Sequence, residues 1–200
     1  MGRIEVITTS AARTGRTPAV IFCCLVLLAG AAWYVFAQFF SSYVPAPPFT
    51  HYETLSAFTE HGVHVTIALE QDANGTFLLA STYTPVDAHV HLYSTDLPRA
   101  GLNGAGRPTL FELPAQSGVH RIGQLTADQP VILDPFPTLN IVFPIYPDGP
   151  VTLRLPIAIE THDTQLDMTV HVTYMACSST GFCLPPVENK SVKLSIAQTP

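Results

Sequence analysis

Two cysteines offer the clearest chemistry in the sequence. Cys177 and Cys183 lie six positions apart in the run VTYMACSSTGFCLPPVE, which covers residues 172–188. A disulfide needs Cα atoms about 5.5 Å apart, whereas six steps of extended strand span about 20 Å. The chain must therefore reverse between them, and SSTG at residues 178–181 is suitable turn material. The pair can act in thiol–disulfide exchange, or it can be an inert disulfide that staples a hairpin.

The residues around this pair resemble a known family. Tyr174 precedes the first cysteine, GFCLPP at residues 181–186 surrounds the second, and Glu188 follows closely. This pattern is similar to the amino-terminal domain of the DsbD family of thiol–disulfide interchange proteins. The run HVHLYS at residues 89–94 is similar, more loosely, to an early strand of that family that ends in an aromatic-rich tip.

The resemblance implies a redox relay on an immunoglobulin-like β-sandwich. The reduced pair would pass electrons to oxidised extracytoplasmic proteins, and a thioredoxin-like or membrane-embedded thiol reductase would reduce it again. The activity would be of thiol:disulfide oxidoreductase type, and two neighbouring cysteines suffice for it without a cofactor. In the family the second cysteine forms the intermolecular disulfide. This role corresponds to Cys183, and Cys177 would resolve the intermediate; the sequence alone leaves the order open.

The resemblance also implies a cap over the cysteines. Family members shield the pair with a loop that carries an acidic residue and a phenylalanine, and the run DPFP, with Asp134 and Phe136, occupies a comparable place. Phe136 would cover the sulfurs, and Asp134 would tune thiol protonation. The alternative is a proline-rich turn with Phe136 in the core. Further candidate supporting residues are Tyr93, Tyr174 and Phe182, although both tyrosines also suit packing inside a sandwich.

Eight histidines give a second hypothesis, an anchored copper- or zinc-binding or delivery domain. His89 and His91 stand two positions apart, so both would point to one face of a strand. The alternative is that the histidines occupy solvated strand faces and loops. The residues that could hold the copper or zinc ion, alone or with the thiols, are His61, His64, His89, His91, Met168 and Met175. A third hypothesis is a structural β-sandwich that binds other proteins.

The elements that must position these residues are predicted to be β-strands. Apolar and polar residues alternate with a period of two from about residue 51, and Asn74-Gly75 between two such runs is a strong hairpin signal. Seven to nine short strands over about 150 residues indicate an all-β, immunoglobulin-like antiparallel β-sandwich. The predicted strands cover residues 63–69, 76–84, 88–94, 109–113, 129–133, 139–144, 151–160, 169–174 and 191–196.

The composition excludes several other classes of protein. The chain has 200 residues, of which 47% are hydrophobic and 12% charged, and its formal net charge is −6. A negative balance speaks against a nucleic-acid binder. The sequence also contains no HExxH zinc motif, no GxSxG elbow and no P-loop, so the common signatures of hydrolases and nucleotide-binding enzymes are missing.

The first fifty residues predict a membrane anchor. Residues 1–18 carry three arginines, and the 22 residues of 19–40 carry no formal charge. A helix of that length spans about 33 Å, enough for a hydrocarbon core of about 30 Å. The positive-inside rule places the N-terminus in the cytoplasm, although a cleaved signal peptide is an alternative. Residues 41–50 would form a proline-rich linker, and 51–200 a periplasmic or extracytoplasmic domain on a single span of the inner, cytoplasmic membrane.

Overall fold

The computed structural model describes residues 51–160, 163–178 and 182–197. These residues form thirteen β-strands and one short 3-10 helix. The predicted all-β fold with antiparallel pairing is therefore confirmed. The predicted anchor at 19–40 and the linker at 41–50 lie outside the described residues. Within the described part of the chain, no helix is long and apolar enough to cross a membrane.

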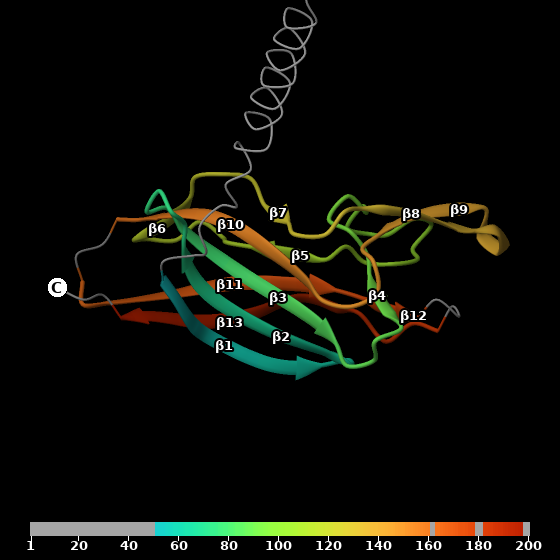
Figure 1. The fold of residues 1–200 in the computed structure, drawn as a ribbon, viewed down its shortest axis with the longest axis horizontal. Helices are drawn as coiled ribbons and strands as arrows, with labels where there is room; N and C mark the ends of the chain where they lie inside the picture. Colours follow the sequence, from blue (N-terminus) through green and yellow to red (C-terminus); the bar gives the residue numbers. More distant parts are fainter. Residues whose placement is uncertain (1–50, 161–162, 179–181, 198–200) are drawn as a thin grey trace, which may run out of the picture. The chain divides into compact units, whose positions relative to one another are not determined.

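The described strands form four antiparallel sheets (Figure 1). The largest contains β1 (His51–Glu60), β2 (Val63–Gln71), β3 (Phe77–Pro85), β10 (Val151–Ile159) and β6 (Val119–Arg121), and β7 (Thr126–Ala127) also pairs with β10. The second contains β13 (Val187–Ala197), β11 (Gln165–Tyr174) and β5 (Leu110–Glu112). Two small sheets pair β4 (Val90–Leu92) with β12 (Ala176–Ser178), and β8 (Ile132–Phe136) with β9 (Ile141–Ile145).

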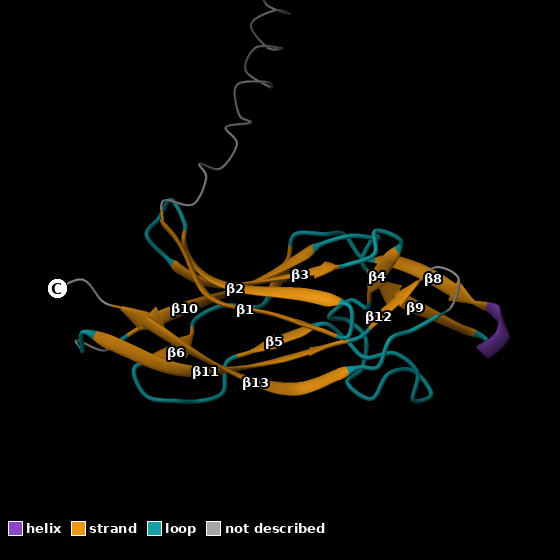
Figure 2. Cartoon of the chain, turned by 90° about the horizontal axis from the view of Figure 1, so that it is seen from below, coloured by secondary structure: helices purple, strands orange, loops and turns teal. Residues whose placement is uncertain are grey.

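The two larger sheets face each other as the layers of a sandwich (Figure 2). Their strands alternate as the sequence predicts: every second residue from Val63 to Leu69 on β2, and from Leu166 to Tyr174 on β11, is buried in one main core. Full burial of a valine or leucine side chain contributes about 1.5–3 kcal/mol. The period-two pattern therefore supplies the main stabilisation of the fold.

The turns between the first three strands follow from local chemistry. His61 and Gly62 join β1 to β2 with positive φ angles of 44° and 70°, as a two-residue hairpin turn requires. The predicted Asn74-Gly75 turn joins β2 to β3, and the Asp72 carboxylate accepts the backbone N–H groups of Asn74 and Thr76. These turns set the register in which β2 pairs with both neighbours.

Several strands differ from the predicted ranges. Strands β1, β6, β7 and β12 were not predicted from the sequence, because β1 alternates imperfectly and the other three have only two or three residues. β8 covers 132–136 rather than 129–133 and includes Pro135. A proline is tolerated there because β8 is an edge strand, in which a residue without an N–H group breaks no ladder.

One end of the sandwich carries the small sheets. Both views place β4, β12 and the β8–β9 hairpin at the same end (Figures 1 and 2). The hairpin is closed by the 3-10 helix η1 (Pro137–Leu139). Cys177 on β12 and Phe136 on β8 therefore come to the same end of the domain, although forty-one positions separate them.

Candidate functional site

Cys177 and Cys183 are joined in a disulfide. They lie opposite each other as an isolated antiparallel bridge, so the chain reverses between them, as the sequence analysis predicts. Two backbone hydrogen bonds flank the disulfide, from Ser178 N–H to Phe182 O at 2.8 Å and from Leu184 N–H to Ala176 O at 2.9 Å.

The alternation of residues 174–177 aims Cys177 away from the main core. Tyr174 and Ala176 belong to the main core. Met175 and Cys177 belong instead to a second apolar cluster, here called the site cluster. Its buried members are Tyr93, Leu97, Ile141, Phe143, Ile145 and Cys177. Cys177 is only 3% exposed, whereas Cys183 is partly buried at the edge of this cluster.

Strand β4 supplies the residues that face Cys177. Val90 and Leu92 point into the main core, so the intervening His91 and the following Tyr93 turn to the other side. His91 lies directly opposite Cys177 in the β4–β12 pair. The Tyr93 hydroxyl lies 3.3 Å from the Cys177 Sγ atom and donates a hydrogen bond to it. One short strand thus places two polar aromatic side chains beside the disulfide.

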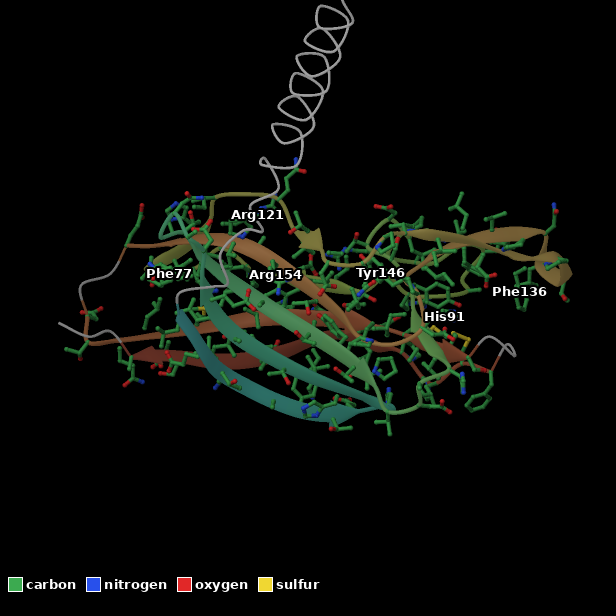
Figure 3. The ribbon with its side chains drawn as sticks, in the orientation of Figure 1. Phe77, His91, Arg121, Phe136, Tyr146 and Arg154 are labelled. Atoms are coloured by element: carbon green, nitrogen blue, oxygen red, sulfur yellow. A yellow bond between two sulfur atoms is a disulfide. The ribbon has the colours of Figure 1, made fainter. Side chains whose placement is uncertain are left out.

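The β8–β9 hairpin covers the other side of the site. Asp134 pairs with Phe143 and Phe136 with Ile141, so all four side chains share the inner face of the hairpin. The Phe143 ring packs edge-on against Tyr93, with centroids 5.2 Å apart, and against Phe136 at 6.2 Å. Figure 3 shows Phe136 and His91 at the end of the domain that carries the disulfide.

These elements enclose a mostly apolar cavity of about 380 Å³. Both cysteines line it, together with four of the polar or aromatic residues already described, namely His91, Tyr93, Asp134 and Phe136. Phe136 packs against the site cluster and Asp134 is half-buried. The structure thus brings together, around one cavity, the two cysteines, both proposed cap residues and one of the two proposed tyrosines.

The surroundings of the site shift the pKa values of Tyr93 and His91. Burial raises the pKa of Tyr93 above its usual value, and the Asp134 carboxylate adds to the shift, so the Tyr93 hydroxyl keeps its proton. Burial lowers the pKa of His91, although Asp148 and Asp134 both oppose that shift. Asp148 Oδ1 lies 3.6 Å from His91 Nδ1.

Tyr174 and Phe182 lie away from the cavity. The Tyr174 hydroxyl donates to Glu60 O at 3.1 Å, and its ring packs edge-on against Tyr83 in the main core. Tyr174 therefore joins β11 to β1 and faces away from the sulfurs. Phe182, next to Cys183, is 69% exposed.

The histidines proposed as metal ligands do not gather in the described part of the chain. Among these residues, no group of three or more His, Cys, Asp or Glu side chains could hold a metal ion. His89 and His91 do not share an environment: β4 begins at Val90, so His89 is exposed in the preceding turn and His91 is buried. The two ring nitrogens of His64 instead form hydrogen bonds with the hydroxyl groups of Thr59 and Thr66.

Sequence reasoning missed Arg107 at the rim of the cavity. Its guanidinium donates to the backbone carbonyls of Gly104 and Gly106, at 3.0 and 2.7 Å, and forms an ion pair with Glu188. Arg107 thereby ties a glycine-rich loop to the segment that follows Cys183. One feature of the sequence could have indicated this role: Arg107 is the last residue of the glycine-rich run GLNGAGR at residues 101–107.

Comparison with known proteins gives one family match and one similar structure. The family model described as "Thiol:disulfide interchange protein DsbD, N-terminal" matches residues 66–195. The solved structure of the Neisseria meningitidis DsbD N-terminal domain in its reduced form has a TM-score of 0.37 and 15% sequence identity. That alignment covers 61% of this chain and 78% of the other. No curated protein matches the sequence.

Proposed function

Because the chain belongs to the family of DsbD N-terminal domains, we propose that it is a thiol–disulfide exchange domain that relays electrons to oxidised exported proteins. The observation that carries the proposal is the Cys177–Cys183 disulfide at the apolar cavity, with one sulfur buried and its partner at the rim. An inert staple needs no cavity beside it, whereas exchange needs space for an incoming sulfur.

The accessible cysteine makes the first bond. In the reduced domain the Cys183 thiolate attacks a sulfur of the substrate disulfide, forms a mixed disulfide and releases one substrate thiolate. Cys177 then loses its proton and attacks Cys183 Sγ, which releases the second substrate thiolate and forms the internal disulfide. Two electrons pass from the domain to the substrate. The partial exposure of Cys183 and the burial of Cys177 support this order.

A thioredoxin-like or membrane-embedded thiol reductase restores the reduced pair. Its thiolate attacks Cys183, Cys177 leaves as a thiolate, and a second thiol of the partner resolves the mixed disulfide. Phe136 restricts access to the sulfurs, and Asp134 adds negative charge beside them. Neither step requires a cofactor. The position of both residues around the cavity supports these roles.

We place the domain outside the cytoplasm, held by a single span at residues 19–40. The support is the uncharged run itself and the arginines that precede it. Fractionation of cells that express the full chain tests this placement. The chain should stay with the inner membrane after an alkaline wash, and residues 51–200 should be open to protease only after the outer face of that membrane is exposed.

Trapping in cells tests the relay. The Cys177→Ser variant leaves Cys183 without its resolving partner, so we expect mixed disulfides that are visible on non-reducing gels and vanish with reductant. Cys183→Ser is the matched control, and its buried Cys177 should trap far less. Absence of any mixed disulfide in Cys177→Ser would contradict the relay.

A further inference from the structure

A buried histidine faces the cysteine pair. His91 and Cys177 occupy opposite positions of the β4–β12 pair, and both line the cavity. Side chains at opposite positions of an antiparallel pair start from Cβ atoms about 4.5–5.5 Å apart. The imidazole therefore lies on the same face as the sulfur that has to lose a proton during exchange.

A carboxylate orients this imidazole. Asp148 Oδ1 lies 3.6 Å from His91 Nδ1, and its negative charge favours the tautomer with the proton on Nδ1. Because burial lowers the pKa of His91, the ring is neutral near pH 7, and Nε2 is the nitrogen that can accept a proton. A nucleophile, a base and a group that orients the base form the arrangement that activates nucleophiles in other proteins.

We propose that His91 accepts the proton of Cys177 when that thiol resolves the mixed disulfide, with Asp148 as a positioning residue; the inference rests on the proposed function. The Cys177 proton moves to His91 Nε2, and the Cys177 sulfur attacks Cys183 Sγ. The bond between Cys183 and the substrate sulfur breaks. The substrate thiolate leaves and takes up one proton, from the imidazolium or from water, so atoms and electrons balance.

The surroundings of Cys177 explain why an acceptor is needed. The sulfur is buried in an apolar cluster, and such surroundings disfavour a thiolate. The imidazolium that forms is stabilised by Asp148, in the β9–β10 turn, and by Asp134 on β8. The other polar side-chain groups around the cavity are the Tyr93 and Ser178 hydroxyls and the Arg107 guanidinium. The proton thus moves between neighbouring groups and need not wait for bulk water.

Stopped-flow absorbance with 4,4′-dithiodipyridine tests the inference on the reduced full chain in mild detergent, with Cys23 and Cys24 replaced by serine so that Cys177 and Cys183 supply the thiols that react. Attack by Cys183 releases one thiopyridone, and resolution by Cys177 releases the second. The Cys177→Ser variant, which lacks the second phase, identifies it. We expect His91→Gln to slow the second phase at least about tenfold near pH 7, to move its pH profile toward higher pH, and to leave the first phase unchanged.

Two further variants complete the test. Asp148→Asn keeps the imidazole and should slow the second phase less than His91→Gln, and it provides the test if His91→Gln does not fold. His89→Gln replaces the neighbouring exposed histidine and should change neither phase. A wild-type second phase in His91→Gln, or slowing by one factor at every pH, overturns the inference and leaves the proposed function standing. A wild-type chain with no second phase overturns the proposed function itself.

Discussion

At the scale of single residues, the two sulfurs of the disulfide have unlike surroundings. Cys177 lies inside the site cluster, opposite His91 and within 3.3 Å of the Tyr93 hydroxyl. Cys183 lies at the edge of that cluster, next to the exposed Phe182. Cys183 is therefore the more accessible of the two sulfurs, whereas the His91 and Tyr93 side chains, which can carry protons, lie beside Cys177.

The Tyr93 hydroxyl should influence the reduction potential of the pair. The Cys177 thiol of the reduced form can both donate to and accept from this hydroxyl, whereas a disulfide sulfur can only accept, so Tyr93→Phe weakens the reduced form more than the oxidised form. We expect the potential to fall by about 20 mV, which corresponds to about 1 kcal/mol. Equilibration with glutathione buffers measures it.

Tyr83→Phe is the matched control for this prediction. It removes the same group from the main core, where the Tyr83 hydroxyl donates to Leu110 O at 3.0 Å. Its potential should equal that of the wild type. An equal fall in both variants would show that the effect comes from the fold and not from the sulfur contact.

His91 should make the stability of the fold depend on pH. Burial lowers its pKa below the ordinary 6.5, so the unfolded chain binds a proton at a pH at which the folded chain does not. The contribution of His91 to the free energy of unfolding is therefore fully present above about pH 6.5, and it is lost as the pH falls toward the pKa of His91 in the folded chain. Urea denaturation measures the free energy of unfolding at about pH 7 and about pH 5.5. The difference between these two free energies should be smaller for His91→Gln than for His89→Gln, and equal differences in the two variants would refute the assignment.

At the scale of elements, the β8–β9 hairpin is attached to the sandwich at its base. Its strands pair with each other, while Ser94 N–H donates to Pro144 O at 2.9 Å and Tyr93 bridges to Ile145. Two-stranded hairpins are marginally stable alone. The aromatic contacts of Phe136 and Phe143 therefore contribute much of the stabilisation that keeps the free end of the hairpin against the cavity.

Phe136→Ala should open this cover. Loss of about 1 kcal/mol of packing raises the population of an open hairpin about fivefold, so a small thiol reductant should reduce the disulfide about fivefold faster. The kinetics of reduction by dithiothreitol measure the effect. Val142→Ala, on the outer face of the same hairpin, should react like the wild type. Equal rates for both variants and the wild type would contradict a covering role.

The sequence predicted the long strands better than the site. Alternation over nine or ten residues reveals β2, β10 and β11, because one face of each is buried against the other sheet. β12 is too short for any period to show. The contact of Tyr93 with Cys177, and the approach of Asp148 to His91, arise only when β4 meets β12 and the β9–β10 turn. Such long-range contacts leave no local pattern in the sequence.

At the scale of the whole domain, the apolar residues divide into the main core and the site cluster. The main core contains neither cysteine and is built from long paired strands. The disulfide closes a loop of only about seven residues, for which the chain-entropy model gives about 2.4 kcal/mol. The sandwich therefore does not depend on the oxidation state of the pair.

We expect the reduced domain to remain folded. Far-UV circular dichroism should be unchanged on reduction, and the free energy of unfolding should fall by at most about 2.4 kcal/mol, measured by urea denaturation with and without reductant. The variant with both cysteines replaced by serine should behave like the reduced protein. Loss of the strand signal on reduction, without denaturant, would contradict the separation of the two clusters.

The self-pairing of the β8–β9 hairpin has an evolutionary consequence. Leu133 and Val142 on its outer face are 70% and 50% exposed, and substitutions at such positions usually change stability by less than about 0.5 kcal/mol. Lineages can therefore alter the outside of the hairpin while its inner face keeps Asp134 and Phe136 at the cavity that the cysteines line. The same sandwich and the same cysteine chemistry could in this way be adapted to new partners through changes in one short segment.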